Sequence, residues 1–162
     1  MRECDGCRFC CWSFNAHDIP NPVTGFEMKP ARQHCVFECD KGCELHATER
    51  LPQACDEFKC PYLQGQDIHR PDTFQEVLEE LGGNIGNYIP AIPARVPISL
   101  ARTLIREDRS VPAFILLGNE WARVILPLDR NEDRTWTARE SAIELWGKLL
   151  DVELLPAGLA AP

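Results

Sequence analysis

All cysteines of this chain lie within its first sixty residues, and this segregation constrains the fold more than any other feature. Residues 61–162 contain none. A chain that uses cysteine as a small buried hydrophobic residue would scatter it along the whole sequence. Disulfides, zinc, and iron or iron–sulfur clusters are the three chemistries that gather thiols this closely. The nine cysteines are Cys4, Cys7, Cys10, Cys11, Cys35, Cys39, Cys43, Cys55 and Cys60.

A disulfide framework is the least favoured of the three. The N-terminal sequence Met-Arg-Glu-Cys has no apolar segment of the kind found in secretory signals, so we expect a cytoplasmic protein. Structural disulfides are rare in that reducing compartment. Nine is also an odd number, which prevents complete internal pairing. The thiols are therefore predicted to bind metal.

Composition narrows the set of partners. The chain is 44% apolar and 26% charged, which is typical of a globular protein, and its formal net charge is −8. An acidic chain without a basic cluster is poorly suited to neutralise phosphates, so we expect no nucleic acid partner. Apolar runs such as Phe114–Leu117 are too short to span a bilayer, so we expect no membrane partner. A protein partner is compatible with these features.

The spacing of the thiols leaves zinc and iron both open. Zinc usually takes four ligands as paired C-x2-C motifs, whereas this chain reads C-x2-C-x2-C-C, then C-x3-C-x3-C, then C-x4-C. Eight or nine thiols could still fill two zinc sites. Cys4, Cys7 and Cys10 with the remote Cys60-Pro61 resemble the ligand pattern of bacterial ferredoxin clusters. Adjacent side chains diverge, so Cys10 and Cys11 should serve different roles.

Two motifs carry a resemblance to a known family. Cys4-Asp-Gly-Cys7-Arg-Phe-Cys10-Cys11 is similar to the CxxCxxCC motif of the YkgJ-type cysteine-cluster family of zinc- or iron-chelating proteins. The stretch from Gly42 to Cys60, and Lys29-Pro30 ahead of Cys35, resemble further features of that family. Leu51, His46 and Asp56 depart from its usual residues. The resemblance implies a metal-chelating module with eight ligands, Cys4, Cys7, Cys10, Cys11, Cys35, Cys43, Cys55 and Cys60, and it leaves Cys39 as the candidate non-ligand.

Two further hypotheses concern what the protein does beyond binding metal. A similar motif occurs in flagellin lysine methylases, so one alternative is an iron–sulfur redox or methyl-transfer enzyme component. The other is a protein-interaction adaptor in which zinc is only a structural staple. Motifs such as G-x-S-x-G, H-E-x-x-H and the P-loop are absent from the sequence, and no catalytic residue is predicted. His17 and His34 are expected to be surface residues, with His34 the stronger ligand candidate because it precedes Cys35.

The predicted fold class is α+β. An irregular, metal-stapled cysteine-cluster module (1–63) is expected to pack on a small α+β unit (71–155), followed by a frayed tail (156–162). Within the second unit, helical periodicity and the capping boxes Thr73–Glu76 and Thr137–Glu140 predict helices. The apolar strand candidates Ala113–Leu117 and Trp121–Leu126, separated by the turn signal Gly118-Asn119, predict a β-hairpin. The expected elements are helices near 73–82, 98–107 and 138–150 and a hairpin over 113–126, with connectors at 84–97 and 129–134.

Three local expectations concern the cysteine-rich part. Asp40-Lys41-Gly42 is a turn signal, so residues 35–43 are predicted to form a short helical turn followed by a loop. Residues 44–47 are predicted to be briefly extended. Pro52 is predicted to open a helix that carries Cys55 and Phe58 on one face and ends before Cys60-Pro61.

Overall fold

The chain folds into short helices and small antiparallel sheets, which confirms the predicted α+β class in its coarse form. The architecture is that of a computed structural model. No helix among the residues it describes is long and apolar enough to cross a membrane. The described residues are 6–17, 19, 28–46, 48–58, 60–81, 88–117, 120–126, 128–130, 132, 135–150 and 159–160.

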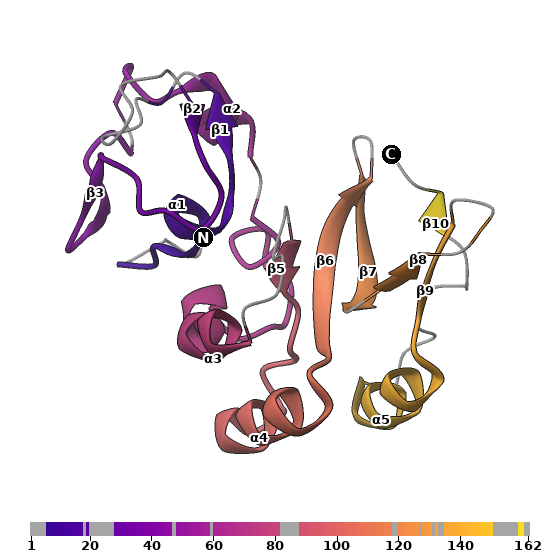
Figure 1. Cartoon of the computed structure of the whole chain (residues 1–162). Helices are drawn as coiled ribbons and strands as arrows, with labels where there is room; N and C mark the ends of the chain where they lie inside the picture. Colours follow the sequence, from indigo (N-terminus) through magenta and orange to yellow (C-terminus); the bar gives the residue numbers. More distant parts are fainter. Residues whose placement is uncertain are drawn as a thin grey trace.

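A three-stranded antiparallel sheet lies at the centre of the molecule (Figure 1). Its order is β5 (Tyr88–Pro90), β6 (Val111–Leu117) and β7 (Glu120–Leu126). The predicted hairpin is therefore confirmed, although β6 begins two residues earlier than expected. Its connecting residues 118–119 lie outside the described ones. Strand β5 falls within the predicted connector 84–97, and it was missed because its edge position tolerates Pro90, a residue that argues against a strand.

Helices α4 (Ile98–Asp108) and α5 (Glu140–Leu150) lie at one end of the molecule, below the central sheet in Figure 1. Both confirm predicted helices. In α5 the side chains of Ala142, Trp146 and Leu150 recur every four residues and are buried, as the pattern predicts.

The predicted helix near 73–82 is divided in the structure. Residues Pro71–Phe74 form a 3-10 turn, and α3 (Gln75–Glu80) follows it. Pro71 is suited to a first helical position, so the chain begins to coil before Thr73. The expected capping boxes are wrong: α3 has no side-chain cap, and Thr137 lies in a strand ahead of α5.

A second three-stranded sheet was not predicted. It consists of β8 (Leu128–Arg130), β9 (Thr135–Ala138) and β10 (Leu159–Ala160), in the order β10-β9-β8. The predicted loop 129–134 and the frayed tail are corrected accordingly, because β10 pairs with β9. Strands of two to four residues leave little periodicity to detect, and β10 is in addition remote in sequence from its partner β9.

The cysteine-rich part contains two short helices and two two-stranded ribbons, and they correct two expectations. Residues 38–43 form a hairpin (β3 with β4) rather than a helical turn and loop, although Asp40 and Lys41 do form its turn. Residues 44–46 form turns rather than an extended piece. The helix after Pro52 is confirmed, but it ends at Glu57, so Phe58 lies beyond it and does not share a helical face with Cys55. The elements are α1 (Phe9–Ser13), β1 (Ala16–His17), β2 (Met28–Lys29), β3 (Glu38–Cys39), β4 (Gly42–Cys43) and α2 (Gln53–Glu57).

The cysteine-rich part shares a hydrophobic core with the rest of the chain. Phe9, Trp12 and Cys60 belong to the same cluster of buried side chains as α3, α4, α5 and the central sheet. A chain of edge-to-face ring contacts adds to it, since Phe58 lies 4.7 Å from Phe14 and 5.6 Å from Trp121 between ring centroids. The predicted division of the chain into two units, 1–63 and 71–155, stays a prediction.

Candidate metal centre

Two glycines bring the first cysteines against the β3–β4 hairpin. Gly6 and Gly42 have φ values of +79° and +113°, in the region that side chains other than glycine rarely adopt. A Cβ at Gly42 would lie 3.7 Å from the carbonyl oxygen of Cys7, and one at Gly6 would lie 3.5 Å from that of Asp40. The tight turn at Gly6 packs Cys7 onto the hairpin turn.

Helix α1 directs its two neighbouring cysteines to different partners. Phe9 is fully buried and Trp12 is nearly so, and both anchor the helix in the core. Cys10 forms a thiol hydrogen bond with Cys60, whereas Cys11 interacts electrostatically with thiols of the hairpin and α2. The divergence of the adjacent side chains is therefore as the sequence predicts.

Cys7, Cys10 and Cys60 form what we call the first thiol group. The Cys10 thiol donates to the sulfur of Cys60, and this hydrogen bond raises the pKa of Cys10 well above its usual value. The same bond lowers the pKa of Cys60 to about 7, and the backbone amides of Leu63 and Tyr62 lower it further. Amides that donate to sulfur favour the thiolate, which is the form that binds metal.

Cys11, Cys35, Cys43 and Cys55 form the second thiol group. Burial, followed by the charges of Cys35 and Cys43, raises the pKa of Cys11 to about 12, and Cys55 adds to the effect. Such interactions weaken with distance, so they indicate that these four thiols lie in the same part of the molecule. The backbone amide of Phe37 donates to Cys35 Sγ at 3.5 Å.

Cys39 lies apart from both groups. In the hairpin register Glu38 is opposite Cys43, and Cys39 is opposite Gly42. Successive side chains of a strand point to opposite faces, so Cys39 and Cys43 project on different sides of the hairpin. The sequence resemblance singled out the same cysteine as the candidate non-ligand.

Lys29 is a buried cation beside the second thiol group. Its side chain is about 2% exposed, and Nζ donates to the carbonyl oxygens of Trp12 (3.4 Å), Phe14 (2.5 Å) and Pro30 (3.0 Å). Burial lowers the pKa of Lys29, and the neighbouring thiolates of Cys35 and Cys11 oppose that shift. The ammonium group of Lys29 thus connects β2 to α1 and places a positive charge beside the second thiol group.

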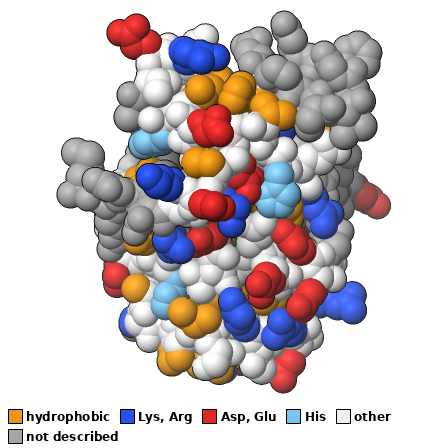
Figure 2. All heavy atoms as spheres, turned by 90° about the vertical axis from the view of Figure 1, so that its left-hand side faces the viewer, with side chains coloured by type: hydrophobic (Ala, Val, Ile, Leu, Met, Phe, Trp, Pro, Cys, Tyr) orange, Lys and Arg blue, Asp and Glu red, His pale blue; other side chains and the backbone are white. Residues whose placement is uncertain are grey.

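The histidines occupy positions outside the two thiol groups. His34 Nδ1 lies 2.7 Å from Glu38 Oε2 on the protein surface, and Arg8 pairs with the same carboxylate at 3.2 Å. His17 is exposed on β1. Acidic and basic side chains are interleaved over the face shown in Figure 2, without a large patch of either sign on its described surface.

The eight cysteines from Cys7 to Cys60 are all free thiols, and Cys4 lies outside the described residues. Among the part of the chain that the structure describes, no group of three or more Cys, His, Asp or Glu side chains is arranged as a finished metal site. The donor set nevertheless suits a soft or borderline metal, because it consists of thiols with amides directed at two of the sulfurs.

Comparison of the chain with protein-family models, with curated proteins and with solved structures finds no match. The resemblance to the YkgJ-type family therefore stays a prediction.

Replacing Lys29 by methionine is expected to lower the free energy of unfolding by about 1–3 kcal/mol, the usual cost of leaving buried hydrogen-bonding groups unsatisfied. Methionine keeps the apolar stem but leaves the carbonyls of Trp12 and Phe14 without their donor. Urea unfolding followed by circular dichroism measures the change. Lys41→Met, in the exposed hairpin turn, is the matched control and should change stability little. Equal effects of the two substitutions would contradict the assigned role of Lys29.

Proposed function

We propose that this protein is a metal-binding cysteine-cluster protein whose two thiol groups each hold a zinc or iron centre. Cys11, Cys35, Cys43 and Cys55 form a four-thiol set, the number that a tetrahedral zinc or an iron–sulfur cluster takes. Cys7, Cys10 and Cys60 form the second set, for which the sequence resemblance implies Cys4 as the fourth ligand. The metal would supply the cross-link between these segments.

The observation that carries the proposal is the lack of an apolar core around the second thiol group. Among described residues 28–46 and 48–58, Leu45 is the sole apolar side chain that is buried, and it is still 8% exposed. The strands there are two residues long and α2 has five residues. Segments that bury so little apolar surface usually need a disulfide or a metal to stay folded. The thiols of this segment are free, which favours the metal.

The arrangement of the thiols supports the proposal independently. Cys11, Cys35, Cys43 and Cys55 come from α1, the loop before β3, β4 and α2, so one metal would tie four separate pieces of chain together. Amide hydrogen bonds to the sulfurs of Cys35 and Cys60 stabilise negative charge on sulfur. Lys29 adds a cation beside the four-thiol set, which offsets part of the charge that four thiolates would carry.

Metal analysis of the protein purified without oxygen tests the proposal. We expect about two zinc ions per chain and no visible colour, or else iron with matching sulfide and a brown chromophore, since these are the two chemistries that suit thiolate sets. The brown outcome would favour the iron–sulfur enzyme hypothesis, and the colourless one the structural zinc hypothesis. A protein with neither metal would overturn the proposal.

Cysteine variants assign the centres. Cys11→Ser is expected to remove about one centre per chain, because a hydroxyl is a poor ligand for zinc or iron beside three thiolates. Cys39→Ser is the matched control and should retain the full metal content, since Cys39 lies on the opposite face of the hairpin from Cys43. If Cys39→Ser loses as much metal as Cys11→Ser, the division into two groups is wrong.

A further inference from the structure

The two thiol groups differ in how firmly the rest of the chain holds them. Cys60 is buried and belongs to the large hydrophobic core cluster, and Cys7 packs against that cluster. Cys10 lies on α1, which Phe9 and Trp12 anchor in the same core. Each described cysteine of the first thiol group is therefore attached to the main hydrophobic core.

The backbone around Cys60 adds further support. The amides of Tyr62 and Leu63 donate to its sulfur, and the side chains of both residues pack against the core cluster. The amide of Gln64 donates to the carbonyl oxygen of Cys60 at 3.0 Å, which closes a turn over residues 60–64. Opening the chain at this cysteine would therefore break hydrogen bonds and expose apolar surface at the same time.

Three cysteines of the second thiol group lie on segments with few buried side chains. Cys55 is exposed on α2, and no residue of that five-residue helix is buried. Cys35 and Cys43 are partly exposed, and Cys43 lies on a strand of two residues. None of these three cysteines belongs to the core cluster of described residues. Segments with few buried apolar contacts open locally at a low cost in free energy, so the second thiol group is the easier of the two to open.

Two attachments allow this segment to open without leaving the core altogether. Cys11 shares α1 with Cys10, so one cysteine of the second thiol group stays on an anchored helix. The ring of Phe58, directly after α2, lies 4.7 Å from the ring of Phe14 between centroids. Residues 35–55 lie between these attachments in sequence, so this stretch can move away from Cys11 and return to it.

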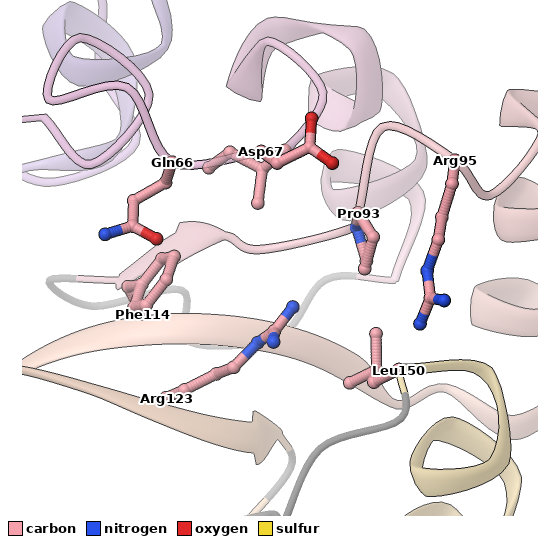
Figure 3. A pocket seen from close by; sticks show the side chains of 8 residues that line it. Gln66, Asp67, Pro93, Arg95, Phe114, Arg123 and Leu150 are labelled. Atoms are coloured by element: carbon pink, nitrogen blue, oxygen red, sulfur yellow. The ribbon is translucent and has the colours of Figure 1, made fainter.

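A cavity of about 430 Å³ in the other part of the chain offers no thiol to a metal, because none of its described lining residues is a cysteine (Figure 3). Two arginines of its lining already donate to backbone carbonyl oxygens. Arg95 donates to Leu149 at 2.9 Å, and Arg123 donates to Ala91 at 3.0 Å. Metal exchange therefore depends on access to the cysteines themselves.

We propose that the second thiol group carries its metal as exchangeable cargo and passes it to an acceptor that presents thiolates, whereas the first thiol group retains its metal. This inference rests on the proposed function, since it requires both groups to bind metal. Thiolates suit the acceptor because they compete for the same soft or borderline metals. Cys55 is the first protein ligand to be replaced, because it is the exposed one.

The exchange step conserves atoms and electrons. The sulfur of an acceptor thiol forms a bond to the metal, and the bond between the metal and Cys55 breaks. The proton of the acceptor thiol passes to the released sulfur of Cys55. No electron is transferred, so the step needs neither an oxidant nor a reductant.

A chelator challenge of the metal-loaded protein, purified without oxygen, tests the inference. The probe is 2,3-dimercaptopropane-1-sulfonate, a small dithiol, and the metal that stays on the protein is measured after gel filtration at successive times. We expect about half of the metal to leave roughly tenfold or more faster than the rest, because local opening limits its release. Release of all the metal in a single phase would overturn the inference.

Two cysteine variants assign the phases. Cys11→Ser is expected to lack the fast phase and keep the slow one, whereas Cys10→Ser should keep the fast phase and lack the slow one. Circular dichroism shows whether each variant remains folded. A fast phase that disappears in Cys10→Ser and persists in Cys11→Ser would contradict the inference.

A substitution that removes no ligand provides an independent test. Ala54 is exposed on α2 next to Cys55. Ala54→Gly should speed the fast phase about fivefold and leave the slow phase unchanged, because glycine weakens a helix. Glu107→Gly, at an exposed position of α4, is the matched control and should leave both rates unchanged. An unchanged fast phase in a folded Ala54→Gly protein would count against the inference.

The metal content before the chelator is added separates this inference from the proposed function. A protein that holds neither zinc nor iron would overturn both. Two centres per chain that lose their metal at the same rate would overturn the inference alone and leave the proposed function standing.

Discussion

Removal of metal by a strong chelator is expected to unfold residues 28–58 while leaving the rest of the chain folded. Among the described residues of this segment Leu45 is the one apolar side chain that is buried, so under the proposed function the metal centres supply the cross-links that a larger core would otherwise provide. Structural zinc contributes on the order of 10 kcal/mol to the folding of small thiolate-bound modules, far more than the short ribbons here can provide. Hydrogen–deuterium exchange resolved by peptide measures the loss of protection in this segment.

The rest of the chain provides an internal control for that experiment. Peptides from α4, β6 and α5 should keep their protection, because their buried side chains belong to the large core cluster. Adding back zinc or iron should restore the protection of residues 28–58. Unchanged exchange after complete metal removal would show that the segment folds without metal and would contradict the proposed role of the thiol groups.

Replacing Trp146 by alanine is expected to destabilise the protein by about 3–5 kcal/mol, the usual cost of removing a large aromatic side chain from a packed core. Trp146 is fully buried in α5, and its Nε1 donates to Ser110 Oγ at 2.7 Å. The substitution therefore leaves a cavity and removes the donor to Ser110 Oγ, whose own hydrogen bond to Asp108 Oδ2 at 2.6 Å remains. Chemical unfolding monitored by circular dichroism measures the loss.

Two further variants separate the contributions at this position. Ile143→Ala lies on the same helix, but its side chain is 36% exposed, so we expect a much smaller loss of stability. Trp146→Phe retains much of the apolar volume and removes the hydrogen bond to Ser110, so it should fall between the wild type and Trp146→Ala. If Ile143→Ala destabilises as strongly as Trp146→Ala, α5 does not pack on the core as described.

Elements with long, regular apolar patterns were predictable from sequence. Helix α5 repeats its buried residues every four positions, and the β6–β7 hairpin consists of two apolar runs on either side of a turn signal, so local physics is enough to define them. Strand β5 and the β8–β10 sheet were missed, because each strand is four residues or shorter, and β5 and β10 pair with strands more than twenty residues away in sequence. The capping boxes were wrong for a related reason. Pro71 begins a 3-10 turn before Thr73, and Thr137 lies in strand β9, so neither threonine caps the helix that follows it.

The candidate site shows the same division. The nine cysteines and their segregation are visible in the sequence, and so is the need of Cys10 and Cys11 for different partners. The sequence pattern predicted a helical turn where the structure has the β3–β4 hairpin. The separation of Cys39 from Cys43 depends on the register of that hairpin, so it could not be predicted. That Arg95 and Arg123 line one cavity carried no sequence signal, because the two residues are far apart and neither belongs to a motif.

The sequence by itself determined the α+β class, the longer helices and the chemistry available in the first sixty residues. Those properties depend on residue type and local periodicity, which need no knowledge of distant contacts. Only the tertiary structure decided which thiols lie in the same part of the molecule and how Lys29 is buried between α1 and β2. It also placed Arg95 and Arg123 in the lining of one cavity. Those features arise where segments remote in the chain pack together, and the position of each group is then fixed by burial and hydrogen bonding rather than by its sequence neighbours.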